Sequence, residues 1–285
     1  MNEEIVKEIV SVLEDKLKSS GLLNKYPNRV LRGDIVEILD ELCTVVYYPL
    51  EKDSNNGFHR IIRSKGEAIH FVYINTAQTI DKQVFTAAHE LGHLWEVDKI
   101  VVDRLGDRIN VECNPSINEE IINRFAAELL MPKNEFVNCL KELIKENEVG
   151  SEIAVTDLIK IVVQLMDRFL VPFKAVLLRF GEIGVLSSED VDGLLHDYNN
   201  PSGLIYSTVN RFIDLLGYTE LRSPYPKKYI KDFAEMLAEA EAKHTLSDEK
   251  IKALREEFGI TQDGVSIDGV LGTTVMLRNV RTHDQ

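Results

Sequence analysis

Residues 86–97 read TAAHELGHLWEV, and this stretch decides the fold of the chain. The sequence before it alternates as strands do, whereas from Thr79 to about Val97 the apolar residues recur at helical spacing. His89 and His93 are four residues apart on this predicted helix, so both imidazoles share one face and can bind one metal ion. Glu90 is offset by one residue, which places its carboxylate beside the ion as a proton acceptor rather than a ligand.

A catalytic zinc ion usually has three protein ligands and one open position, so a third ligand must come from elsewhere. The next strong helix, predicted over 118–131, begins with Glu119 and Glu120. Glu119 shares a face with the apolar residues of this helix, whereas Glu120 shares a face with Arg124, a natural ion-pair partner in water. We therefore expect Glu119 to be the third ligand and keep Glu120 as the alternative.

The two segments together resemble the ImmA/IrrE family of zinc metallopeptidases. The family pattern is H-E-L-G-H followed by E-x-x-A-N-x-F-A-x-x-L-L-M-P, and this sequence has HELGH at 89–93 and EEIINRFAAELLMP at 119–132. The similarity covers about 30–186, and Ile122 stands where the family usually has alanine. The resemblance implies one zinc ion per chain, a general base at Glu90, and metal ligands at His89, His93 and Glu119.

The resemblance also implies the architecture. We expect an α+β fold: a mainly helical, zincin-like metallopeptidase domain with a small β-sheet over residues 1–186, including a helix–turn–helix-like segment after the protease core. A mostly helical C-terminal extension should follow over 187–285. By analogy with relatives that carry a C-terminal sensor domain, this extension is expected to sense a signal or to recruit the substrate.

Members of this family typically cleave a helix–turn–helix transcriptional repressor after a stress signal such as DNA damage. The expected function is therefore zinc-dependent endopeptidase activity that releases mobile-element, stress-response or antiphage genes. The alternative is a non-proteolytic binding module that contacts a repressor or toxin and holds a structural zinc ion. The intact Glu90 speaks against that alternative, because a structural site needs no base.

Hydrophobic spacing predicts the remaining elements. Strands are predicted at 43–48, 58–63 and 67–75, and the last of these is a candidate edge strand for pairing with an extended substrate. Residues 98–118 are polar and predict a loop. Further helices are predicted over 3–18, 31–42, 133–146, 155–169, from Pro172 to about 181, and 228–243.

Two smaller features suggest regulation or signal binding. Cys113 precedes Glu119 by six residues, and its thiolate could occupy the open zinc position as a switch, although the alternative is an ordinary loop thiol. A basic and aromatic cluster could bind single-stranded DNA or another signal by charge and stacking, although a solvated helix start explains it as well. The cluster consists of Arg222, Lys227, Lys228 and Lys231 with Tyr225 and Tyr229.

The composition limits the remaining function classes. The 285 residues contain 33 Lys and Arg against 47 Asp and Glu, a net charge of −14, which argues against a general binder of nucleic acid or anionic membrane. Three scattered cysteines favour a reduced compartment. Without a signal-peptide-like start or an apolar run of about 18–20 residues, we expect a cytoplasmic protein with no membrane partner.

Overall fold

A computed structural model of the chain describes residues 2–26, 30–50, 55–64, 66–109, 116–150 and 153–261. The chain forms two compact units, each built from two separate stretches of sequence. The first unit holds the residues up to Val36 together with Thr79–Pro224, and the second holds Glu37–Gln78 together with the chain from Tyr225 onward. The first boundary between them falls inside helix α3 (Asp34–Leu42).

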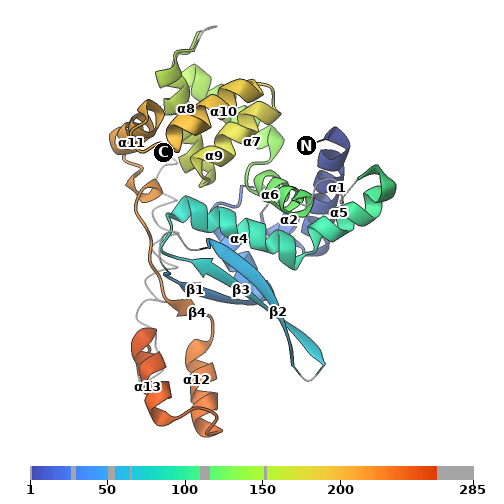
Figure 1. The fold of residues 1–285 in the computed structure, drawn as a ribbon, viewed down its shortest axis with the longest axis vertical. Helices are drawn as coiled ribbons and strands as arrows, with labels where there is room; N and C mark the ends of the chain where they lie inside the picture. The colour runs from blue at the N-terminus through green and yellow to red at the C-terminus, as the bar shows by residue number, and fades with distance from the viewer. Residues whose placement is uncertain are drawn as a thin grey trace. The chain divides into compact units, whose positions relative to one another are not determined.

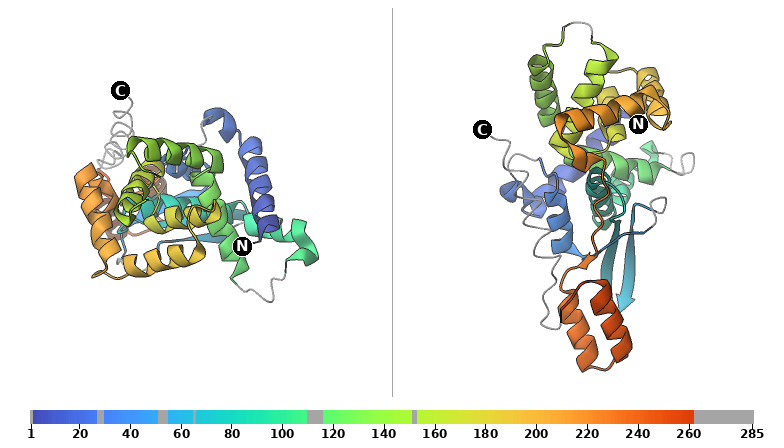
Figure 2. Two further views of the ribbon diagram at one scale, coloured as in Figure 1. Left: turned by 90° about the horizontal axis from the view of Figure 1, so that it is seen from above. Right: turned by 90° about the vertical axis from the view of Figure 1, so that its left-hand side faces the viewer.

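The first unit is helical. Helix α4 packs against α6, α1 packs against α5 and α6, and the helices α8 to α11 form a second group of mutual contacts (Figures 1 and 2). Its helices are α1 (Glu3–Ser19), α2 (Leu22–Lys25), α4 (Ile80–Leu94), α5 (Val97–Leu105), α6 (Ile117–Leu130), α7 (Lys133–Glu146), α8 (Val155–Phe169), α9 (Phe173–Glu182), α10 (Ser188–Tyr198) and α11 (Leu204–Leu216), with short 3-10 turns η1 (Gly106–Arg108) and η2 (Thr219–Leu221). The predicted helices over 3–18, 118–131, 133–146 and 155–169 are confirmed.

The second unit contains a mixed sheet of four strands in the order β2-β3-β1-β4 (Figure 1). The strands are β1 (Thr44–Tyr48), β2 (Gly57–Ser64), β3 (Glu67–Asn75) and β4 (Tyr229–Ile230). Strands β1 and β3 are parallel, while β2–β3 and β1–β4 are antiparallel. Strand β3 therefore lies inside the sheet, and the expectation that it is an edge strand is wrong; β2 and β4 are the edges.

The predicted loop over 98–118 is wrong for its first half. Residues 97–105 form α5, whose buried face consists of Val97, Val101 and Leu105 at four-residue spacing. The charged residues between these positions make the segment polar overall, so its composition predicted a loop. The predicted active-site helix also ends earlier than 97, at Leu94, because Glu96 adopts a left-handed conformation with φ of 53°.

The helix predicted over 228–243 begins later than expected. Its first residues form β4, because Tyr229 and Ile230 pair with Tyr47 and Val46 of β1. After Asp232, which has a φ of 56°, the chain forms α12 (Phe233–Ala242) and α13 (Asp248–Glu257), which lie side by side (Figure 2). Leu237 and Ile251 of these helices form a small core with Phe258 and Ile260, and Tyr48 of β1 and Ile230 of β4 pack against it.

The α+β class, with a small sheet and a helical C-terminal part, is confirmed. The compact units do not follow the expected boundary at residue 186, because α9 and α10, on either side of it, pack together in the first unit. Phe173 and Tyr198 stack across this contact with ring centroids 4.2 Å apart. No helix in the described part of the chain is both long enough and apolar enough to cross a bilayer.

Candidate metal centre

Helix α4 brings two imidazoles together on one face. The Nε2 atoms of His89 and His93 are 3.1 Å apart, and the ring centroids are 4.8 Å apart in an edge-on arrangement. This is the geometry that the four-residue spacing predicts for a helix. Both rings therefore direct a nitrogen to the same point.

The first turn of α6 supplies a carboxylate to that point. The Glu119 oxygens lie 3.4 Å from His89 Nε2 and 3.6 Å from His93 Nε2. The side chain of Glu119 is 60% exposed, so the approach to the site is open on this side. Glu120 is directed elsewhere and accepts a hydrogen bond from the Ser116 hydroxyl at 2.8 Å.

These three side chains suit a single tetrahedral ion. Nitrogen and oxygen ligands that sit ~2.1 Å from one zinc ion in tetrahedral geometry are ~3.4 Å apart, close to the separations observed here. Among the described residues, His89, His93 and Glu119 are the only group of three histidine, cysteine or carboxylate side chains with ligand atoms this close together. Two imidazoles and one carboxylate leave a fourth position for water or substrate.

Glu90 lies beside the ligands but takes no part in their contacts. It is buried, with 3% of its surface exposed, and within the described residues its Oε2 atom has no hydrogen-bond partner. Burial, with the nearby charge of Glu119, raises the pKa of Glu90 to about 7. A carboxyl group with such a pKa can both accept and release a proton near neutral pH.

The histidine environment favours the neutral imidazole that a metal requires. Burial, followed by the proximity of His93, lowers the pKa of His89, although Glu119 and Asn123 oppose this shift. A neutral ring keeps one nitrogen lone pair free for coordination. The donor set and its protonation therefore both fit a divalent cation such as zinc.

Comparison with known proteins agrees with this geometry. Residues 42–180 match the peptidase family described as the IrrE N-terminal-like domain. This part of the chain belongs to the ImmA/IrrE family. No curated protein matches the chain. Among solved structures, it is similar to a Mycobacterium tuberculosis transcriptional regulator at 16% identity and a TM-score of 0.40, over 64% of this chain and 52% of that one. The chain thus spans about half the length of that structure.

The ImmA/IrrE region places α4 and α6 unusually close together at Gly92. A Cβ atom there would lie 3.0 Å from Phe125 Cδ1 and 3.2 Å from Ile122 Cδ1. Ile122, which replaces the usual alanine of the family, is fully buried and fills this contact. The glycine of the HELGH motif therefore sets the distance between the two helices that carry the ligands.

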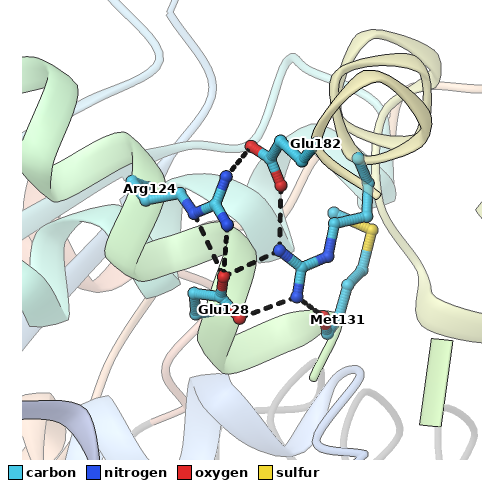
Figure 3. Close-up of polar contacts among 5 residues, drawn as sticks. Arg124, Glu128, Met131 and Glu182 are labelled. Atoms are coloured by element: carbon cyan, nitrogen blue, oxygen red, sulfur yellow. Dashed lines mark hydrogen bonds and ion pairs between the residues drawn. The ribbon is translucent and has the colours of Figure 1, made fainter. Parts of the chain in front are cut away.

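The far end of α6 is fixed by a buried ionic network (Figure 3). Arg179 of α9 donates to both carboxylate oxygens of Glu128 at 2.7 Å, and also to the Met131 carbonyl oxygen at 2.8 Å. Glu182 pairs with Arg179 at 2.8 Å and with Arg124 as well. Burial opposes ionisation of Glu128, but the hydrogen bonds and charges of the two arginines outweigh it and lower its pKa.

The other predicted site residues lie apart from this centre in sequence. Cys113 falls outside the described residues, so its role as a switch stays a prediction. In the first unit Arg222 pairs with Asp214 at 2.6 Å. In the second, Lys227 lies over the Tyr229 ring at 4.2 Å and Lys228 pairs with Glu257, while Lys231 donates to the Asp40 carbonyl oxygen at 3.3 Å. Each cation thus has a partner within the chain, which favours a structural role.

Asn123 lies in the motif segment 119–132, but the motif alone assigned it no role. Its Oδ1 atom lies 3.0 Å from Nδ1 of His89, the ring nitrogen that faces away from the other ligands. The sequence signal for a role at the metal centre is the position of Asn123. It lies four residues after Glu119 and therefore on the same face of α6.

Proposed function

We propose that the chain is a zinc endopeptidase that cleaves a helix–turn–helix transcriptional repressor, or a similar partner protein, in response to a stress such as DNA damage. Cleavage would derepress mobile-element, stress-response or antiphage genes. The observation that carries this proposal is the convergence of three ligand atoms beside Glu90, a buried carboxyl group with one oxygen that has no partner within the described residues. Membership of a metallopeptidase family supports it.

The roles of the residues follow from their positions. His89, His93 and Glu119 would hold one zinc ion per chain. When bound, the ion would polarise the scissile carbonyl group and make water a stronger nucleophile at neutral pH. Glu90 accepts the proton that the attacking water loses and returns it to the amine nitrogen as the peptide C–N bond breaks.

The substrate class and the trigger rest on the family resemblance rather than on the site. The site itself accounts for hydrolysis of a peptide bond but not for the choice of protein. We propose that residues 187–285 determine which protein is cleaved and when, as a sensor or a segment that recruits the substrate. The helices α12 and α13, which share a small core that packs against Tyr48 and Ile230 of the sheet, are the part of this segment that we propose for that role.

A co-expression experiment tests the proposed function. The chain is produced together with a helix–turn–helix repressor encoded beside its gene, with and without DNA-damaging treatment, and the repressor fragments are measured. The wild type should remove intact repressor and yield two fragments, whereas Glu90→Gln should leave it intact. Equal repressor loss with both proteins would contradict proteolysis and favour the alternative, a non-proteolytic binding module with a structural zinc ion.

A further inference from the structure

Asn123 contacts the metal centre from outside the three ligands, because its Oδ1 atom reaches the outer nitrogen of His89. That nitrogen, Nδ1, lies 3.0 Å from Oδ1, whereas Nε2 of the same ring lies 3.4 Å from Glu119. The two ring nitrogens of His89 thus have different neighbours. One faces the ligand cluster, and the other faces an amide.

A proton can sit on only one of these nitrogens in the neutral ring. Coordination through Nε2 requires the proton on Nδ1, and a half-buried N–H group is stabilised by a hydrogen-bond acceptor. The amide oxygen of Asn123 is that acceptor. If the amide were turned, its NH₂ group would donate to Nδ1 and force the proton onto Nε2, where it would block the metal.

We infer that Asn123 is a positioning residue of the metal centre, which holds His89 in the Nδ1–H tautomer with Nε2 directed to the ion. The inference rests on the metal site of the proposed function. Because Glu119 and Asn123 are four residues apart on α6, one rigid helix supplies both a ligand and the group that orients a second ligand. An amide does this without adding a second negative charge beside Glu119.

Substitution of Asn123 separates this role from a purely structural one. Asn123→Leu keeps the size of the side chain but removes the acceptor, and Asn123→Asp keeps an acceptor. Asn123 is exposed, so neither change disturbs the core. Asn118→Leu is the matched control, because Asn118 is an exposed asparagine of the same helix more than one turn away.

The first readout uses metal-free protein at pH 8, where two-bond ¹H–¹⁵N NMR correlations report the tautomer of His89. In metal-free protein Glu119 and His93 also face Nε2 and favour a proton there, so the expected result is a difference between variants: Asn123→Leu should shift His89 towards the Nε2–H form relative to wild type, Asn123→Asp and the control. The second readout is zinc affinity, measured by competition with a chromogenic chelator. We expect Asn123→Leu to bind zinc ~10–100-fold more weakly and Asn123→Asp to bind at least as tightly as wild type.

An unchanged tautomer in Asn123→Leu would overturn the inference, as would zinc affinity within twofold of the control. If wild-type protein itself binds no zinc, the proposed function fails, while the tautomer comparison still decides the role of Asn123. The two proposals can therefore fail separately.

Discussion

Arg179 and Glu128 form a two-point ion pair in the interior of the first unit, with both nitrogen–oxygen distances at 2.7 Å. Their side chains are 1% and 7% exposed. Removal of one partner from a buried pair leaves a charge without compensation, which typically costs ~3–5 kcal/mol. We expect Arg179→Met to lower the free energy of unfolding by about that amount in chemical denaturation.

The control for this prediction is Arg222→Met, which breaks an exposed pair with Asp214. Exposed pairs contribute ~0–1 kcal/mol, so the control should stay close to wild type. A similar decrease in the free energy of unfolding of the two variants would show that the buried network in Figure 3 stabilises the fold no more than an exposed ion pair does.

A second prediction concerns the contact between α4 and α6. Gly92→Ala places a methyl group 3.0 Å from Phe125 Cδ1, so the helices must move apart or the ring must shift. Overpacking of this kind costs ~1–3 kcal/mol, which exceeds the gain of up to ~1 kcal/mol in helix propensity. We expect lower thermal stability and, because both helices carry ligands, weaker zinc binding.

Gly193→Ala is the matched control, because Gly193 lies in α10 with no atom within 4 Å of the added Cβ position. This variant should be slightly more stable than wild type and bind zinc normally. Combining Gly92→Ala with Ile122→Ala, the usual residue of the family, should restore part of the loss. Equal stability of the two glycine variants would contradict the packing argument.

Much of this site follows from sequence, and its limits have physical causes. The spacing of His89 and His93 is a local property of one helix, so the motif predicts their convergence. The hydrogen bond between Asn123 and His89 joins residues 34 apart, and the spacing of Asn123 from Glu119 indicates the helix face but not the partner. Arg179 and Glu128 are charged residues that resemble solvent-exposed ones until their partners are known.

The sheet shows the same limit. Strand β4 has only two residues, Tyr229 and Ile230, and forms because the C-terminal part of the chain returns to β1. A segment so short has no alternation to detect. The division into two units, each made of separate stretches of sequence, follows from such long-range pairing and not from composition.

The pH dependence of stability provides a third prediction. Burial, opposed by the Tyr47 hydroxyl and two lysines, raises the pKa of Asp40 from 3.8 to about 6. The folded state therefore binds a proton at Asp40 more tightly than the unfolded state does. The contribution of Asp40 to stability is thus greatest below pH 4. It falls between pH 4 and 6 and is lost above that range.

Replacement by a neutral amide should reverse this penalty. Asp40→Asn can still accept the hydrogen bond of Tyr47, so we expect it to be more stable than wild type at pH 7, by about 3 kcal/mol at most. The difference should shrink as the pH falls to 4. Glu41→Gln, at an exposed position of the same helix, controls for the general loss of a negative charge. A gain that does not change with pH would argue against this explanation.

The most direct measurement of the central claim is zinc content and affinity in four purified proteins: wild type, Glu90→Gln, Glu119→Gln and Glu120→Gln. We expect one zinc ion per chain with similar affinity in wild type, Glu90→Gln and Glu120→Gln. Glu119→Gln removes a ligand itself. Its zinc affinity should therefore fall by more than the ~10–100-fold that is typical when only a residue that orients a ligand is lost. Wild-type protein without stoichiometric zinc, or equal affinity in Glu119→Gln and Glu120→Gln, would contradict the assignment of His89, His93 and Glu119 as the metal centre.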